Sequence, residues 1–159
     1  MGFYRIAGAL ILAVSGIGGA YWLNQSATAS LRQVEAWLAL LRYVKTQVEC
    51  FSLPVSEILR RADPQLLRGC GYMGTMPPRS FEALLTFCAI RDGETEQLIR
   101  SFAEEFGKSY REEQSRSCDY YFSLLDARRE GLVSQLPAKK RINSALCVSG
   151  ALALVILLI

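Results

Sequence analysis

The pattern of apolar and charged positions divides the chain into three parts. Between Arg5 and Arg32 there is no charged residue, and Ile6–Leu23 is almost wholly apolar. No charge follows Arg141 either, so Ile142–Ile159 is a second uncharged segment. Between these segments apolar residues recur at steps of three and four, the spacing of amphipathic helices. The pattern predicts a helical domain with a transmembrane helix at each end.

The C-terminal segment gives the clearest membrane signal. Its eighteen residues from Ile142 extend about 27 Å as a helix, close to the thickness of a bilayer's hydrocarbon core. Lys139, Lys140 and Arg141 come directly before it, and basic residues beside a short span tend to stay in the cytosol. We therefore expect these three residues to be a membrane-flanking basic cluster and the middle of the chain to be cytosolic.

The N-terminal segment has two interpretations. Its glycines lower its hydrophobicity, whereas Tyr21 and Trp22 suit the membrane interface, so a weaker second span is expected. The alternative is a cleaved secretory signal, because Ala27–Ala29 forms an A-x-A site after an apolar run. Cleavage there places the middle domain outside the cell.

The middle of the chain reads as consecutive helices. A long amphipathic helix over 31–51, nearly continuous with the first span, is expected to end at Ser52 and Pro54. Asp63 is expected to cap a short helix that ends at Gly69, and residues 69–78 form a loop. A helix from Phe81 is predicted to continue through Ile90 and end near Asp92, which caps the next one.

The motif at 107–114 predicts the junction before the last helix. Gly107 can close the preceding helix, and Ser109 with Glu112 fits an S-x-x-E capping box, with Gln114 completing the motif. The following helix carries an apolar face towards the membrane, with a kink expected at Pro137.

No stretch alternates as a strand does, so the fold class is all-α: a compact antiparallel helical bundle flanked by an N-terminal and a C-terminal transmembrane helix. The predicted parts are a tail over 1–5, a transmembrane helix over 6–23, a cytosolic helical domain over 24–138, and a basic flank with a transmembrane helix over 139–159.

Composition argues against several functions. The chain has no histidine, and its net charge of +3 is too small to favour nucleic acid as a partner. Its five cysteines are widely spaced without a C-x-x-C pair, which is poor for zinc or for a disulfide framework. We expect no catalytic, cofactor-binding or metal-binding residues, and a protein that is not an enzyme.

The sequence resembles the stage III sporulation protein AB family. The pieces that carry the resemblance are Leu53–Leu59 after the long helix, the four residues Gly107, Ser109, Glu112 and Gln114, and the segment Lys139–Ile159. Where the family usually has Asp after the serine of this motif, the chain has Tyr110.

The resemblance implies a scaffold subunit of a sporulation channel complex between mother cell and forespore. Family members look like the F-type platform protein of type II secretion and type IV pilus systems. The implied partners are a cytosolic secretion-type ATPase and other membrane subunits, with possible self-association, and the implied location is the mother-cell side of the outer forespore membrane. The alternative is a small membrane-anchored regulator or thiol redox sensor that uses Cys50, Cys88 or Cys118.

Overall fold

A computed structural model describes the backbone of residues 2–51, 53–107 and 110–158. Side chains are described within these ranges except at 2–17, 111, 151, 154–155 and 157–158. Six helices make up the described chain: α1 (Gly2–Phe51), α2 (Val55–Arg61), α3 (Pro64–Gly69), α4 (Phe81–Thr86), α5 (Gly93–Glu105) and α6 (Arg111–Leu158). These residues contain no strand, so the all-α prediction is confirmed.

The chain separates into two units. Unit 1 consists of residues 1–29 and 133–159, and unit 2 of residues 30–132. The long helices α1 and α6 each contribute to both units, as the prediction of a helix running on from the first uncharged segment requires.

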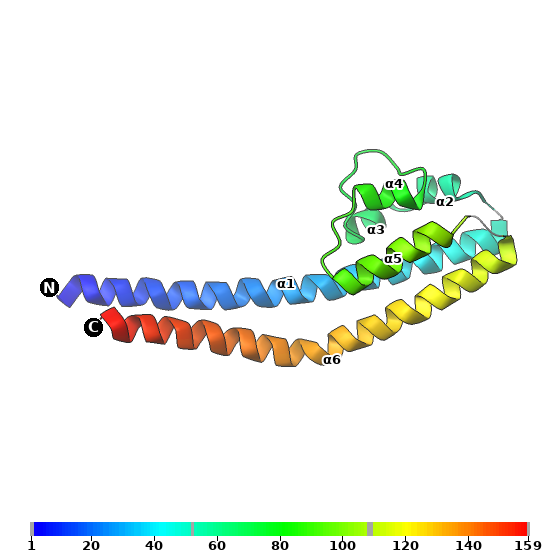
Figure 1. Cartoon of the computed structure of the whole chain (residues 1–159). Helices are drawn as coiled ribbons and strands as arrows, with labels where there is room; N and C mark the ends of the chain where they lie inside the picture. The colour runs from blue at the N-terminus through cyan, green and yellow to red at the C-terminus, as the bar shows by residue number, and fades with distance from the viewer. Residues whose placement is uncertain (1, 52, 108–109, 159) are drawn as a thin grey trace. The chain divides into compact units, whose positions relative to one another are not determined.

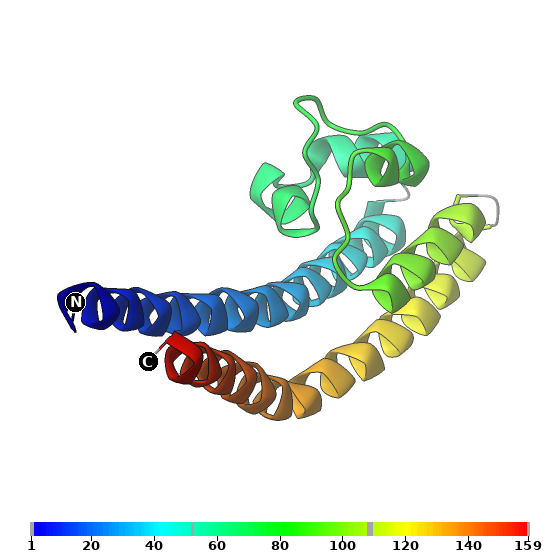
Figure 2. The same cartoon turned by 60° about the vertical axis from the view of Figure 1, so that its left-hand side comes forward.

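Unit 1 is a pair of helix segments, one from α1 and one from α6, that lie side by side (Figures 1 and 2). Asn24 of α1 makes the polar contacts across the pair: its Nδ2 donates to Ser144 Oγ at 3.5 Å, and its Oδ1 accepts from Asn143 Nδ2 at 3.3 Å. In the described part of the chain no helix has an apolar stretch long enough to cross a membrane. The side chains of the predicted span over 6–17, and several over 151–159, lie outside the described residues.

Unit 2 has one apolar core to which every helix contributes. The residues 34, 37, 41, 44 and 48 of α1 are buried at the predicted helical spacing, and Trp37 is completely enclosed. The ring of Phe102 in α5 packs edge to face against Phe81 in α4 and Tyr121 in α6. The ring centroids are 5.0 Å apart for Phe81 and Phe102, and 5.5 Å apart for Phe102 and Tyr121. These contacts hold the short helices against the two long ones.

Local capping chemistry places most helix boundaries where the sequence predicts them. Asp63 accepts a hydrogen bond from Gln65 N at the start of α3, and Asp92 accepts one from Thr95 N at the start of α5. At the end of α5, Gly107 has φ = 93°, a conformation that glycine adopts without strain. The capping box of Ser109 lies outside the described residues.

The predicted helix from Phe81 through Ile90 is wrong in its second half. Helix α4 ends at Thr86, and residues 87–89 instead bond to the loop after α3. Met73 N donates to Phe87 O at 2.9 Å, and Ala89 N donates to Gly71 O at 3.0 Å. These bonds form an isolated antiparallel bridge between Tyr72 and Cys88. Apolar spacing alone did not reveal this pairing because it joins segments separated by a whole helix.

A partly buried ion pair joins α6 to the start of α5. The Arg128 guanidinium donates to both carboxylate oxygens of Asp92, at 2.9 Å and 2.6 Å, and its other amino group pairs with Glu94 at 2.5 Å. Asp92 also caps α5, so one side chain serves both contacts. Hydrogen bonds from Arg128 and Thr95 lower the pKa of Asp92 well below its ordinary value.

We expect Asp92→Asn to destabilise unit 2 by about 1 to 3 kcal/mol at neutral pH. Because asparagine can still cap the helix, the loss of stability measures the contribution of the negative charge of Asp92. Because the folded-state pKa is depressed, this stabilisation is complete above the unfolded-state pKa near 4 and is lost as pH falls through the lower folded value. Unfolding by denaturant at several pH values should show wild type and variant converging below about pH 4. A gap independent of pH contradicts the assignment.

Candidate functional site

A buried glutamine fixes the segment that carries the candidate site. Gln33 of α1 is almost fully enclosed, and its Nε2 donates to Cys70 O at 3.0 Å and to Ala89 O at 2.7 Å. Its Oε1 accepts from Arg91 N at 2.9 Å. One side chain thus satisfies three backbone groups from two loops, and it holds both loops against α1.

We call these three hydrogen bonds of Gln33 the Gln33 clamp. The positive φ of Gly71 makes the clamp possible. Gly71 has φ = 98°, and a Cβ atom at this position would lie 2.4 Å from Gln33 Nε2 and 2.6 Å from Ala89 O. Both separations are too short for a real side chain, so only glycine fits between the two loops. The loop over 70–80 is therefore positioned by its anchored first residues.

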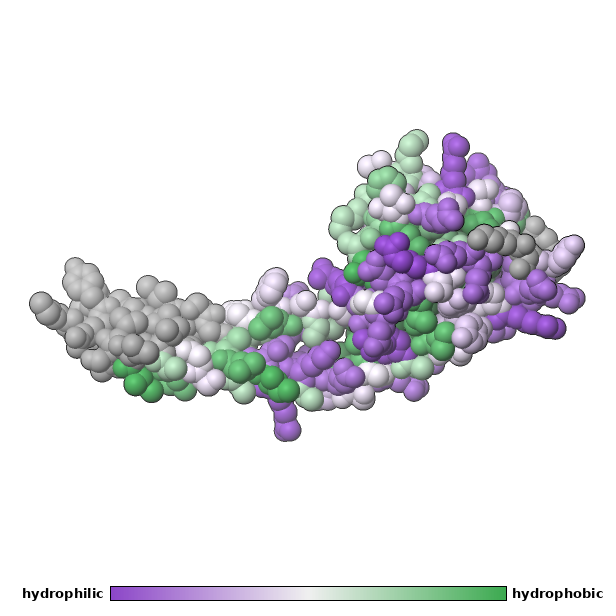
Figure 3. Space-filling view, viewed as in Figure 1, coloured by the Kyte–Doolittle hydropathy of each residue, from purple (hydrophilic) through white to green (hydrophobic). Residues whose placement is uncertain are grey.

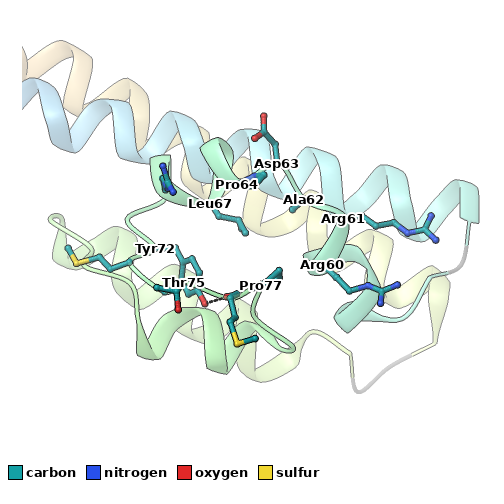
Figure 4. Close-up of a pocket in the computed structure, with 13 residues that line it drawn as sticks. Arg60, Arg61, Ala62, Asp63, Pro64, Leu67, Tyr72, Thr75 and Pro77 are labelled. Carbon is teal, nitrogen blue, oxygen red and sulfur yellow. Dashed lines mark hydrogen bonds between the residues drawn. The ribbon is translucent and has the colours of Figure 1, made fainter.

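This loop and the α2–α3 segment enclose a groove in unit 2, which we call the basic groove. Its lining runs from Arg60 to Arg68 and from Tyr72 to Pro77, with a cavity volume of about 760 Å³. Figure 4 shows Tyr72 and Thr75 on the opposite side of the hollow from Pro64 and Leu67. The Tyr72 hydroxyl donates to Met76 O at 2.5 Å and braces the loop across its turn.

The rim of the basic groove is positively charged. Arg60 and Arg61 both pair with the single carboxylate of Glu57, at 2.6 Å each. Arg68 makes no ion pair with any residue that the structure describes. The only acidic residue of the lining, Asp63, accepts the α3 capping bond. Positive charge is thus in excess around an apolar floor.

The residues predicted from sequence do not form a site together. Lys139, Lys140 and Arg141 are exposed on α6 in unit 1. Gly107, Glu112 and Gln114 lie at the junction of α5 and α6 in unit 2, where Gln114 N donates to Tyr110 O within the first turn of α6. The roles that the sequence suggests for these residues stay predictions.

The arginines of unit 2 differ in their surroundings. Arg128 is held in the Asp92 ion pair with one fifth of its side chain exposed, so it is a structural residue. Arg60 and Arg61 keep most of their side chains exposed and remain available to a partner.

The thiols of the compact core are poorly suited to redox sensing. Burial raises the pKa of Cys88 to about 11 and that of Cys118 to about 12, so both remain protonated at neutral pH. Cys50 is exposed at the end of α1. All five cysteines are unpaired, and the described residues contain no cluster of three or more potential metal ligands.

Sequence reasoning missed both Gln33 and Gly71. Gln33 falls on the apolar face of the long helix, four residues before Trp37, and a polar residue at such a position is a signal that it satisfies buried backbone groups. Gly71 is one of three glycines in the predicted loop, and the sequence alone does not distinguish the strained one. The basic groove, too, required the folded loop.

The described residues thus form an all-helical protein whose unit 2 has a compact core and a groove with a basic rim. The sequence of residues 78–159, just over half of the chain, matches the family described as Stage III sporulation protein AB. The chain belongs to this family, and its role is therefore related to sporulation. No curated protein and no solved structure matches the chain.

Proposed function

We propose that the protein is a non-enzymatic scaffold subunit of a sporulation channel complex, anchored in a membrane through both ends of its chain. Unit 2 lies in the cytosol of the mother cell, beneath the outer forespore membrane. There it couples a cytosolic secretion-type ATPase to membrane subunits of the complex. Family membership supports the sporulation setting, and the layout of the chain supports the scaffold mechanism.

The observation that carries the proposal is the continuity of the two long helices. Helix α1 contains both the uncharged segment Ile6–Leu23 and the core residue Trp37, and α6 contains both Tyr121 and the part of the second uncharged segment from Ile142 to Leu158. A helix that passes from an anchor into a packed core transmits force without a flexible linker.

Exposed apolar side chains in unit 1 also support the anchors. Tyr21 and Trp22 lie where the first span is expected to meet the membrane interface, and their surfaces are 71% and 70% exposed. Ile142, Leu146, Leu152 and Ile156 of α6 are exposed too, and hydrophobic surface is visible on the described part of unit 1 in Figure 3. Moving such apolar side chains from water into contact with lipid is energetically favourable.

The topology can be tested with a thiol that the chain already carries. Cys50 is exposed, whereas Cys70 and Cys118 are buried, so a membrane-impermeant maleimide should label Cys50 first. In intact cells we expect no labelling, and after permeabilisation we expect labelling that Cys50→Ser removes. Labelling of Cys50 in intact cells, or a mature chain that begins near Ser30, contradicts the cytosolic placement.

The orientation should depend on the basic cluster beside the second span. Replacing Lys139, Lys140 and Arg141 with glutamine removes the charges that favour the cytosolic side, and we expect a several-fold rise in labelling of Cys50 in intact cells. Replacing Arg100 and Arg116 of unit 2 in the same way is the matched control, because these charges lie far along the chain from either segment. An unchanged labelling pattern in the triple variant argues that another feature sets the orientation.

The partners are tested separately by crosslinking and mass spectrometry on sporulating membranes. Crosslinks from unit 2 to a cytosolic ATPase support coupling. Crosslinks confined to proteins outside the cytosol contradict it.

A further inference from the structure

The basic groove has the properties of a surface that binds another protein. Its lining includes the apolar residues Leu67, Pro77, Met73 and Met76, and the two methionines have 76% and 77% of their surface exposed. Methionine is flexible and polarisable, and it recurs on surfaces that receive the apolar face of a partner helix. Nothing in the core requires these two side chains to be apolar.

Charge identifies the chemistry of the occupant. Arg60 and Arg61 share one carboxylate, Glu57, so one positive charge of that group remains uncompensated. Arg68 on the same rim has no ion-pair partner among the described residues, so even with the carboxylate of Asp63 in the lining the groove keeps an excess of positive charge. An apolar floor with a basic rim is complementary to apolar side chains flanked by carboxylates.

We propose that the basic groove binds an amphipathic helix of a protein partner in which leucine-like side chains are flanked by glutamate or aspartate. The apolar side chains pack on the exposed Met73, Met76 and Pro77, and the carboxylates pair with Arg68 and with the Arg60–Arg61 pair. The proposal rests on the proposed function in that a scaffold needs a surface for its partner, and it adds the chemistry of that partner.

The anchoring of the groove makes it a preformed site. Gln33 fixes the backbone at Cys70, and the Tyr72 hydroxyl fixes it at Met76, so the loop is held at both ends of the segment that lines the groove. A preformed surface loses little conformational freedom on binding. The exposed arginines and methionines can therefore be changed without disturbing the fold.

The test uses the full chain in a non-ionic detergent and a fluorescent peptide with leucines at helical spacing and glutamates beside them. We expect saturable binding measured by fluorescence polarisation, which weakens at higher salt. A peptide with lysine in place of each glutamate is the control ligand, and it should bind at least about tenfold more weakly.

Two variants locate the binding surface. Arg68→Glu reverses a rim charge that has no ion-pair partner among the residues the structure describes, and Met76→Asp places a charge on an exposed apolar side chain of the lining. Each should weaken binding of the acidic peptide by about tenfold or more. Arg32→Glu is the matched control, because Arg32 is an exposed arginine of unit 2 on α1, outside the groove lining. It should leave the affinity within about twofold.

Three results overturn the proposal: no binding of the acidic peptide, equal binding of the lysine peptide, or equal losses in Arg68→Glu and Arg32→Glu. If vesicles of anionic phospholipid bind through Arg68 and the peptide does not, the groove recognises lipid headgroups and the proposed protein partner is wrong. Labelling of Cys50 tests membrane topology by a different readout, so failure of the groove and failure of the proposed function are distinguishable.

Discussion

Gln33→Leu is expected to destabilise unit 2 by about 2 to 4 kcal/mol, because it leaves the carbonyls of Cys70 and Ala89 and the N–H of Arg91 without their partner. Leucine is similar in size to glutamine, so the loss of stability comes more from the missing hydrogen bonds than from altered packing. Cys70 is completely buried, and water cannot replace the bond to its carbonyl.

Tryptophan fluorescence provides the measurement. The chain has two tryptophans, and Trp37 is fully buried in the core of unit 2 whereas Trp22 is exposed in unit 1. In a Trp22→Phe background, urea titration of the full chain therefore reports the unfolding of unit 2 alone. Gln97→Leu is the matched control at an exposed position of α5 and should change stability by less than about 0.5 kcal/mol. Similar losses in both variants contradict the clamp.

Gly71→Ala is expected to have an effect of similar size, also about 2 to 4 kcal/mol. The positive φ costs an alanine about 1 to 2 kcal/mol, and its Cβ collides with Gln33 Nε2 and Ala89 O, so the hydrogen bonds of the clamp are strained as well. The same urea titration measures this loss. Gly93→Ala is the control, since a Cβ there meets no atom within 4 Å.

Because the two changes damage the same contacts, they should not add. With Gln33 already shortened to alanine, the Cβ of Gly71→Ala no longer meets the amide nitrogen, and part of the second loss disappears. A double-mutant cycle should therefore give a total smaller than the sum. Strict additivity indicates that the strain at Gly71 comes from φ and from Ala89 O without a contribution from Gln33.

These predictions also bear on the basic groove. The clamp at Gln33 and Gly71 positions the start of the loop that forms one wall of the groove. Variants that loosen it should weaken binding of the acidic peptide while the rim arginines are intact. The groove variants Arg68→Glu and Met76→Asp, by contrast, should leave the urea midpoint nearly unchanged, because both side chains are exposed.

Most helices of unit 2 could be predicted from the sequence because their signals are local. The buried stripe of α1 repeats at helical spacing, and Asp63 and Asp92 occupy the capping positions that their short side chains favour. The end of α1 at Phe51 before Pro54 follows from the same kind of signal, since proline disfavours helix in the residue before it.

The candidate site was not predictable in this way. In the sequence Arg68 and Arg128 both look like solvated arginines, but in the structure Arg128 binds Asp92, which lies 36 positions away. Which of two similar arginines is buried depends on what packs against it. That information lies in the tertiary structure.

The sequence by itself determined the helical class, most helix boundaries, the two uncharged ends and the resemblance to the sporulation family, since each depends on residues close together in the chain. The tertiary structure alone decided that α4 ends at Thr86, that Gln33 joins two loops to α1, and that Gly71 must be glycine. These features arise where segments distant in sequence meet, and there unsatisfied backbone groups and steric contacts outweigh local helix preference.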